Sequence, residues 1–175
     1  MDRRVLVMRA GTGPSNNLIR SLKTGDPSLC VVGCHADRFV LKKSPADRNY
    51  LIPASTSPDF AEAVNSVIKM ERIDLLIPNN DVDVRMVSDL RDEIACRLFL
   101  PRKHVIELCQ DKFSLTAFLR SHGVHAPLTY PVDDLDTIED VFARLVPASR
   151  LWCRIRTGSS SAGARPSLFS RKQAR

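Results

Sequence analysis

Residues 5–22 read VLVMRAGTGPSNNLIRSL, and this stretch predicts a strand, a turn and a helix in succession. The run from 5 to 9 is short, apolar and rich in β-branched residues, as buried strands are. AGTGPSN follows as a turn of small and polar residues, and Leu18, Ile19 and Leu22 then lie on one helical face. A strand that leads through a glycine-containing turn into a helix is the first unit expected of an α/β fold.

The same alternation continues to about residue 100. The predicted strands are VLVMR (5–9), LCVVGC (29–34), the short piece 50–52, IDLLIP (73–78) and CRLFL (96–100). Thr56-Ser57-Pro58 is typical of a helix start, and 81–94 reads as a further helix. Apolar strands that alternate with helices indicate an open parallel sheet covered on both sides. The fold class is therefore α/β, with a Rossmann-like open parallel sheet as domain 1–100.

From Pro101 the pattern changes, and residues 101–175 are expected to form a second, incomplete α+β lobe. Two short helices follow each other and end at Gly123, which suits a left-handed helix end. LTY (128–130) is predicted as a short strand, an amphipathic helix reaches Leu145, and LWCRI (151–155) is a further strand. Ser167 to Arg175 looks like the opening of a helix.

Composition limits the classes of function. The chain has 175 residues, 43% of them hydrophobic, no apolar run of eighteen and no secretory signal, so a cytoplasmic protein without a membrane partner is expected. The net charge is +6, but four basic residues and no acidic one fall in 165–175, so the excess is mostly in that segment. Without a clustered basic face, nucleic-acid binding is disfavoured. The five cysteines (Cys30, Cys34, Cys96, Cys109 and Cys153) are odd in number and widely spread, which favours reduced, buried thiols.

Two places at the expected sheet edge could bind a ligand. Gly11 and Gly13 would let the backbone approach an anion at the helix N-terminus, yet Asn16 stands where a dinucleotide fingerprint has its third glycine. A tight turn without ligand is favoured there. Asn80 and Asp81, with their neighbours Asn79 and Asp83, follow an apolar strand and could line a polar crevice. The same side chains are good helix caps, and capping alone is the favoured interpretation.

The second half carries a more specific pattern. Arg154 and Arg156 lie two apart on a predicted strand, hence on one face, and TGSSSAG follows them. A loop without bulky side chains lets backbone amides approach a phosphate, while arginines offer forked, permanently charged donors. A lysine at a helix start, as Lys112 is, suits a nearby anion. Together these residues predict a polyphosphate clamp rather than a linker.

In this order, the motifs resemble the ATP-grasp superfamily, and most closely the carbamoyl-phosphate synthase large subunit branch. The matching pieces are VLVMRAGTGPSNNLIRSL, IDLLIPNND, the segment from Leu100 to Tyr130 and LWCRIRTGSSSAG, which together span nearly the whole chain. The most specific piece is the aspartate-lysine helix start followed by a Gly-Val-x-x-Pro turn. The resemblance implies a Rossmann-like domain followed by an ATP-grasp domain.

The resemblance also implies roles for individual residues. Lys112 matches a nucleotide-contacting basic residue, Arg154 matches the basic residue on the strand before the phosphate loop, and Arg156 lies beside it. The loop itself comprises Gly158, Ser159, Ser160, Ser161 and Gly163. Apart from the resemblance, Gly11, Gly13, Asn80 and Asp81 at the expected sheet edge are the candidate substrate contacts. The implied reaction uses ATP and Mg²⁺: a small carboxylate attacks the γ-phosphate, and a nitrogen nucleophile opens the acylphosphate.

In the family, the magnesium ligands and the nucleoside contacts lie beyond this loop, so we expect an N-terminal portion that is inactive alone and carries no metal site. The same resemblance implies that Ser167 to Phe169 is a strand that follows the loop. Two alternatives remain: a non-catalytic nucleotide- or dinucleotide-binding module, and a basic interaction protein that uses 165–175. The oligomeric state is left open, a homodimer included.

Overall fold

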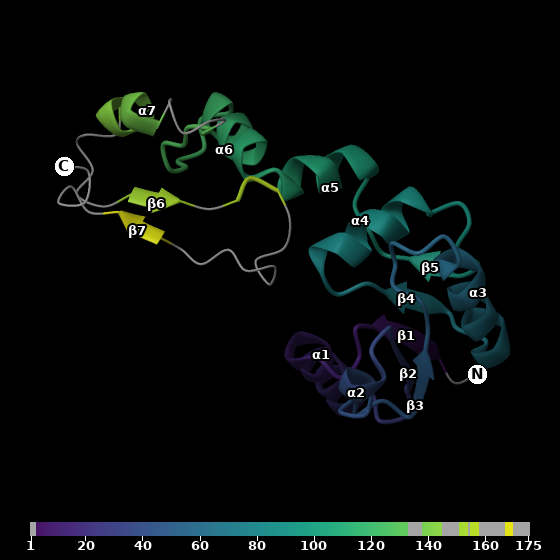
Figure 1. Ribbon diagram of the computed structural model, residues 1–175. Helices are drawn as coiled ribbons and strands as arrows, with labels where there is room; N and C mark the ends of the chain where they lie inside the picture. Colours follow the sequence, from purple (N-terminus) through teal and green to yellow (C-terminus); the bar gives the residue numbers. More distant parts are fainter. Residues whose placement is uncertain (1–2, 133–137, 145–150, 154, 158–166, 170–175) are drawn as a thin grey trace. The chain divides into compact units, whose positions relative to one another are not determined.

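The computed structural model describes residues 3–132, 138–144, 151–153, 155–157 and 167–169 (Figure 1). The chain divides into two compact units, Met1–Ile106 and Glu107–Arg175. The division falls inside one helix, whereas the sequence analysis sets the domain boundary after residue 100, and that boundary stays a prediction.

The first unit is built on a parallel sheet of five strands (Figure 1). Its order is β3-β2-β1-β4-β5, and every neighbouring pair is parallel. The strands are β1 (Arg4–Met8), β2 (Cys30–His35), β3 (Arg48–Leu51), β4 (Leu75–Ile77) and β5 (Arg97–Leu98). The helices between them are α1 (Gly13–Gly25), α2 (Arg38–Leu41), α3 (Phe60–Glu71) and α4 (Asp81–Asp89). The predicted α/β class and the open parallel sheet are therefore confirmed.

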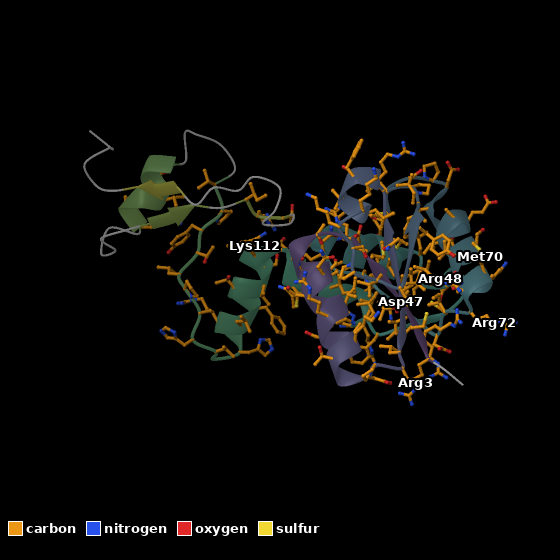
Figure 2. All side chains as sticks on the ribbon, turned by 90° about the horizontal axis from the view of Figure 1, so that it is seen from below. Arg3, Asp47, Arg48, Met70, Arg72 and Lys112 are labelled. Carbon is orange, nitrogen blue, oxygen red and sulfur yellow. The ribbon has the colours of Figure 1, made fainter. Side chains whose placement is uncertain are left out.

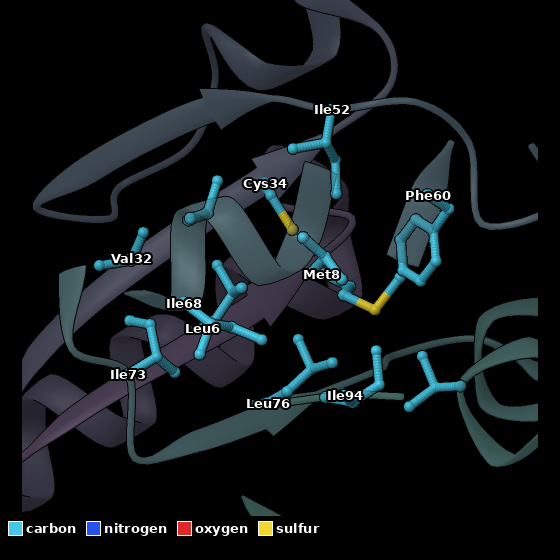
Figure 3. Close-up of a cluster of buried hydrophobic side chains, with 13 residues drawn as sticks. Leu6, Met8, Val32, Cys34, Ile52, Phe60, Ile68, Ile73, Leu76 and Ile94 are labelled. Carbon is cyan, nitrogen blue, oxygen red and sulfur yellow. The ribbon is translucent and has the colours of Figure 1, made fainter. Parts of the chain in front are cut away.

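Helices cover both faces of the central strand β1, whose alternate residues point to opposite sides of the sheet. Leu6 and Met8 of β1 pack on one face with α3 and α4, and Figure 3 shows this cluster around Met8 and Phe60. Val5 and Val7 pack on the other face with side chains of α1 and α2. Fully burying a side chain of this size stabilises the fold by about 1.5–3 kcal/mol. Two buried faces explain why β1 reads as an unbroken apolar run.

Two helix boundaries differ from the predicted ones. Helix α3 begins at Phe60 rather than at Ser57 or Pro58, and its N-cap residue Asp59 makes no side-chain capping bond. Helix α4 ends at Asp89, five residues before the predicted end, and turns lead on to β5. Residues 91–93 continue the polar pattern of the helix without continuing its backbone, so hydrophobic periodicity alone could not locate this end.

The second unit contains helices and a two-stranded sheet (Figure 1). Helix α5 (Lys103–Gln110) leads into it, and α6 (Lys112–Ser121), α7 (Ile138–Arg144), β6 (Leu151–Cys153) and β7 (Ser167–Phe169) follow. Strands β6 and β7 are antiparallel, with Trp152 opposite Leu168. Gly123 has φ +74°, which confirms the expected left-handed helix end.

Two predictions for this unit are wrong. Residues 128–130 are irregular rather than a strand, because the prolines that frame them remove backbone donors on both sides. Ser167–Phe169 is a strand and not the opening of a helix. The strand is the element that the family resemblance implied at this position, so the resemblance was right where local pattern was wrong.

The cysteines are less buried than the sequence suggested. Cys34 is buried, Cys30 and Cys96 are half-buried, and Cys109 is exposed, while Cys153 has a described backbone only. Burial raises the pKa of Cys96 to about 11 and that of Cys34 further still. Within the described ranges, no helix is both long enough and apolar enough to cross a membrane.

Candidate functional site

The strand order of the first unit defines where a ligand would be expected. The chain builds β2 and β3 on one side of β1 and then crosses to β4 and β5 on the other. Ligands of open parallel sheets gather at such a reversal, outside the carboxyl ends of the strands. The turn 9–12 after β1 and the turn 78–80 after β4 flank this point. Gly11, Gly13, Asn80 and Asp81 therefore lie in or beside these two turns, as the sequence analysis supposed.

Gly11 is required by the geometry of the first turn. Its φ is +96°, which L side chains rarely adopt, and a Cβ placed there would meet the backbone oxygen of Val40 at 1.9 Å. The preceding Arg9 also has a positive φ, of 58°. Gly13, the first residue of α1, has open space around its Cα. The chain therefore needs the first glycine for close packing against α2, and not the second.

The side chain of Asn16 makes two hydrogen bonds that stabilise the turn after β1. Its Oδ1 accepts a hydrogen bond from the backbone N–H of Gly11 at 2.9 Å, and its Nδ2 donates to the carbonyl of Lys43 at 3.0 Å. A dinucleotide-binding turn offers such backbone amides to a pyrophosphate instead. In this chain the residue that replaces the third glycine occupies the Gly11 donor, which favours the tight turn over an anion site.

A chain of hydrogen bonds crosses the reversal point between β1 and β4. Asn79 donates from Nδ2 to Ser15 Oγ at 2.9 Å, and Ser15 Oγ donates to the carbonyl of Met8 at 2.9 Å. Ser15 is fully buried. Asn79 and Ser15 thus tie the two halves of the sheet together at the place where a polar crevice was one of the two interpretations.

The polar residues after β4 form the start of helix α4. Asn80 caps α4 by accepting from the backbone N–H of Asp83 at 2.7 Å. Asp83 is buried, and its Oδ1 accepts from Ser55 Oγ at 2.5 Å. Its Oδ2 has no hydrogen-bond partner among the described residues. Asp81 lies in the first turn of the helix, where negative charge is favourable.

His35 ends β2 close to this group. Its Nδ1 accepts a hydrogen bond from the backbone N–H of Asp37 at 2.7 Å, so the other ring nitrogen carries the proton of the neutral ring. Burial is the main cause that lowers the pKa of His35, and the positive charge of Arg9 adds to it. The histidine is thus kept neutral and fixed in one tautomer.

The second unit brings two of the predicted phosphate-binding residues together. The backbone N–H of Lys112 donates to the carbonyl of Arg156 at 3.1 Å, and Lys112 Nζ lies 3.4 Å from the same oxygen. Figure 2 labels Lys112 on its helix. Two cationic residues that are 44 positions apart in sequence are therefore in contact through the main chain, and a polyphosphate site requires cationic residues to come together in this way.

Asp111 is the residue that the sequence analysis did not single out as part of this site. Its Oδ1 and Oδ2 both accept from Arg156 Nε at 3.0 Å, and Oδ2 lies 2.9 Å from Nη2. Its Oδ1 also caps α6 by accepting from the backbone N–H groups of Phe113 and Ser114 at 3.1 and 3.0 Å. Hydrogen bonds from Arg156 and Ser114 hold the pKa of Asp111 well below its usual range.

Asp111 changes what the position of Lys112 at a helix start implies about a bound anion. A lysine at a helix start opposes the helix dipole, and this suggested an external anion. The cap carboxylate one residue earlier already supplies negative charge there. The dipole argument alone therefore no longer points to a ligand, whereas the meeting of Lys112 with Arg156 still does. An aspartate directly before a predicted helix is a capping signal, and this signal could have identified Asp111.

The other predicted phosphate-site residues lie outside the described part of the chain. These are Arg154, Gly158, Ser159, Ser160, Ser161 and Gly163. Within the described ranges, no three His, Cys, Asp or Glu side chains come together as metal ligands would.

Several solved structures have a fold similar to that of this chain. N5-carboxyaminoimidazole ribonucleotide synthetase from Thermotoga maritima matches 98% of this chain with a TM-score of 0.63 and 16% identity. The biotin carboxylase–β,γ-ATP complex from Campylobacter jejuni matches 97% with a TM-score of 0.61 and 14% identity. The biotin carboxylase domain of Hydrogenobacter thermophilus 2-oxoglutarate carboxylase, a complex with MgADP, ADP and bicarbonate, matches 95% with a TM-score of 0.60 and 18% identity.

These three enzymes are members of the ATP-grasp superfamily. The chain has the fold of the N-terminal part of such enzymes. It spans 42%, 39% and 37% of the three solved chains, respectively. No protein-family description matches the sequence, and no curated protein is detectably similar to it. At these identities the likeness shows the fold, and the activity has to be argued from the residues.

Proposed function

We propose that this chain binds the triphosphate of ATP as the N-terminal portion of an ATP-grasp ligase. The observation that carries the proposal is the meeting of Lys112 with Arg156 at the start of α6. Lys112 Nζ lies 3.4 Å from the backbone carbonyl of Arg156, and the Arg156 guanidinium pairs with the neighbouring Asp111. A compact cation and a planar guanidinium on adjoining residues would suit the dense negative charge of a phosphate chain. Arg154 and the loop Gly158, Ser159, Ser160, Ser161 and Gly163 are proposed to complete the grip.

The proposed reaction joins a small carboxylate to a nitrogen nucleophile. A carboxylate oxygen attacks the γ-phosphorus, the bond to the bridging oxygen breaks, and ADP leaves with that electron pair. The nitrogen then attacks the acyl carbon and displaces phosphate. Lys112 and Arg156 would hold the phosphates in line and offset the charge that moves onto the leaving oxygen. The motif pattern favours a carbamoyl-phosphate synthase-like member within the family.

Magnesium would neutralise the phosphates in such a reaction, and the family resemblance implies magnesium ligands beyond the loop 158–163. Because the chain spans about two-fifths of the enzymes with its fold, we propose that it binds the triphosphate without completing the reaction. A cytoplasmic location, a small carboxylate partner and a homodimer belong to the same proposal. For Gly11, Gly13, Asn80 and Asp81 of the first unit, substrate binding remains a proposal.

The test compares two nucleotides by isothermal titration. ATP should bind to the purified chain, and Lys112→Gln should weaken this binding by about tenfold to a hundredfold, since a hydrogen bond to a charged group contributes about 1.5–3 kcal/mol. Lys69→Gln is the matched control, because Lys69 is an exposed lysine of α3 in the first unit. A dinucleotide module would instead bind NAD⁺ tightly, and Lys112→Gln would leave its affinity for NAD⁺ unchanged. That result, or no ATP binding at all, would overturn the proposal.

A further inference from the structure

Asp111 makes two kinds of contact at one place. As the N-cap of α6 it accepts from two backbone N–H groups of the first turn. As the partner of Arg156 it faces the guanidinium edge that carries Nε and Nη2, at 2.9–3.0 Å. The ring of Phe113 lies under the same guanidinium, with 5.4 Å from Arg156 Cζ to the ring centroid. A capping bond alone would need neither the arginine nor the ring.

We propose that Asp111 is a positioning residue that holds Arg156 beside Lys112 in the orientation needed to bind an ATP phosphate. The proposal rests on the proposed function and adds a role for a residue that does not itself touch the ligand.

The geometry supports orientation rather than simple charge pairing. The carboxylate is fixed to the rigid first turn of α6 by its capping bonds, so the arginine is fixed to the helix that carries Lys112. The backbone N–H of Lys112 donates to the carbonyl of Arg156, which fixes the main chain as well. An arginine side chain loses much rotamer freedom on binding, and prior ordering removes that cost.

Charge alone predicts that Asp111 has the opposite effect on phosphate binding. A carboxylate beside the site repels phosphate, so its removal would tighten binding if electrostatics dominated. The two effects have opposite signs in the same variant, and the experiment decides between them.

The experiment is isothermal titration of tripolyphosphate, and of ATP, into the full chain and into variants at Asp111 and Arg156. Asp111→Asn and Asp111→Ser both keep a good N-cap but remove the bidentate partner of Arg156. Each should weaken binding roughly tenfold, as loss of a charge-assisted contact does. Asp89→Asn is the matched control, because Asp89 forms ion pairs with Arg85 and Lys103 in the first unit.

A double-variant cycle separates positioning from a structural effect. In Arg156→Gln, further change of Asp111 to Asn should cause no additional weakening, because there is no arginine left to orient. A loss that persists in this background would show a general effect on α6 and would overturn the inference. So would unchanged or tighter binding by Asp111→Asn in a chain that otherwise binds ATP. No binding by the unaltered chain would overturn the proposed function, and the inference with it.

Discussion

At the scale of single residues, Gly11 and Gly13 have opposite requirements although they lie two positions apart. We predict that Gly11→Ala destabilises the first unit by on the order of 1–3 kcal/mol, from a strained positive φ and the contact with Val40. Gly13→Ala is the control and should leave stability unchanged or slightly higher, since open space surrounds that position. Urea denaturation followed by circular dichroism measures both. Equal effects of the two substitutions would contradict the described turn.

Glu71 of the first unit has a buried carboxylate with several hydrogen-bond partners. It is 1% exposed, and its carboxylate accepts from Tyr50 Oη, from Arg48 at 2.9 Å and from Arg4 at 3.0 Å. The hydrogen bond from Tyr50, followed by that from Arg48, lowers the pKa of Glu71 below its ordinary value of 4.5. The ionised carboxylate therefore ties the end of α3 to the first residues of β1 and β3.

We predict that Glu71→Gln costs about 1–3 kcal/mol at pH 7, since it weakens several hydrogen bonds to a buried charge. Because the folded-state pKa is depressed, this stabilisation is fully present above pH 4.5 and is lost as pH falls through the folded-state value. The gap between the unaltered chain and the variant should therefore narrow below pH 4.5 in denaturant titrations. The exposed Glu93→Gln serves as control. A gap that stays constant down to pH 3 would contradict this account of Glu71.

Sequence reasoning reached some of these residues and missed others for a physical reason. It identified Gly11 as a turn glycine and Asn80 as a cap, because both roles depend on local backbone geometry. It missed the Glu71 network and the Asp111–Arg156 pair, whose partners are 45 residues apart in the second case. Which acid meets which arginine is set by the folded chain, and no local pattern contains it.

At the scale of elements, the strands of the first unit were predicted well, and the ends of its helices less well. β1, β2 and β4 are buried on both faces and read as apolar runs, whereas β3 is an edge strand with mostly exposed residues and gave only a short signal. Ser167–Phe169 forms a strand because β6 provides a partner, although its local pattern suggested a helix. Pairing across a sheet can override such a weak local preference.

The burial of Cys34 in β2 predicts that its thiol reacts slowly. Cys34 lies in the cluster under α3, and burial raises its pKa, whereas Cys109 on α5 is exposed. We expect iodoacetamide at pH 8 to modify Cys109 first and Cys34 only after unfolding, because the buried thiol is both protonated and inaccessible. Peptide mass spectrometry over time gives the order of modification. Early modification of Cys34 would contradict the packing of α3 on β1 and β2.

At the scale of the whole molecule, the two hydrophobic clusters of the first unit are formed entirely by residues before 101. A unit with its own core could fold alone. We predict that a chain ending at Ile106 retains the circular dichroism of a mixed α/β protein and melts cooperatively. The unaltered chain measured in parallel is the reference. A non-cooperative transition in the shortened chain would show that the first unit depends on the second.

The whole-molecule account also separates the two candidate ligand sites, since they lie in different units. The turn after β1 belongs to the first unit, where Asn16 already occupies the Gly11 amide. The start of α6 belongs to the second, where Lys112 meets Arg156. A ligand that uses one site will disturb different backbone amides from a ligand that uses the other.

The most direct measurement is therefore a titration of ATP into the ¹⁵N-labelled chain, followed by backbone amide chemical shifts. We predict that the largest changes fall on 111–114 and 155–157, and that Lys112→Gln reduces them. Changes concentrated on 11–16, or no change at saturating ATP, would contradict the claim that this chain grips a triphosphate at the start of α6.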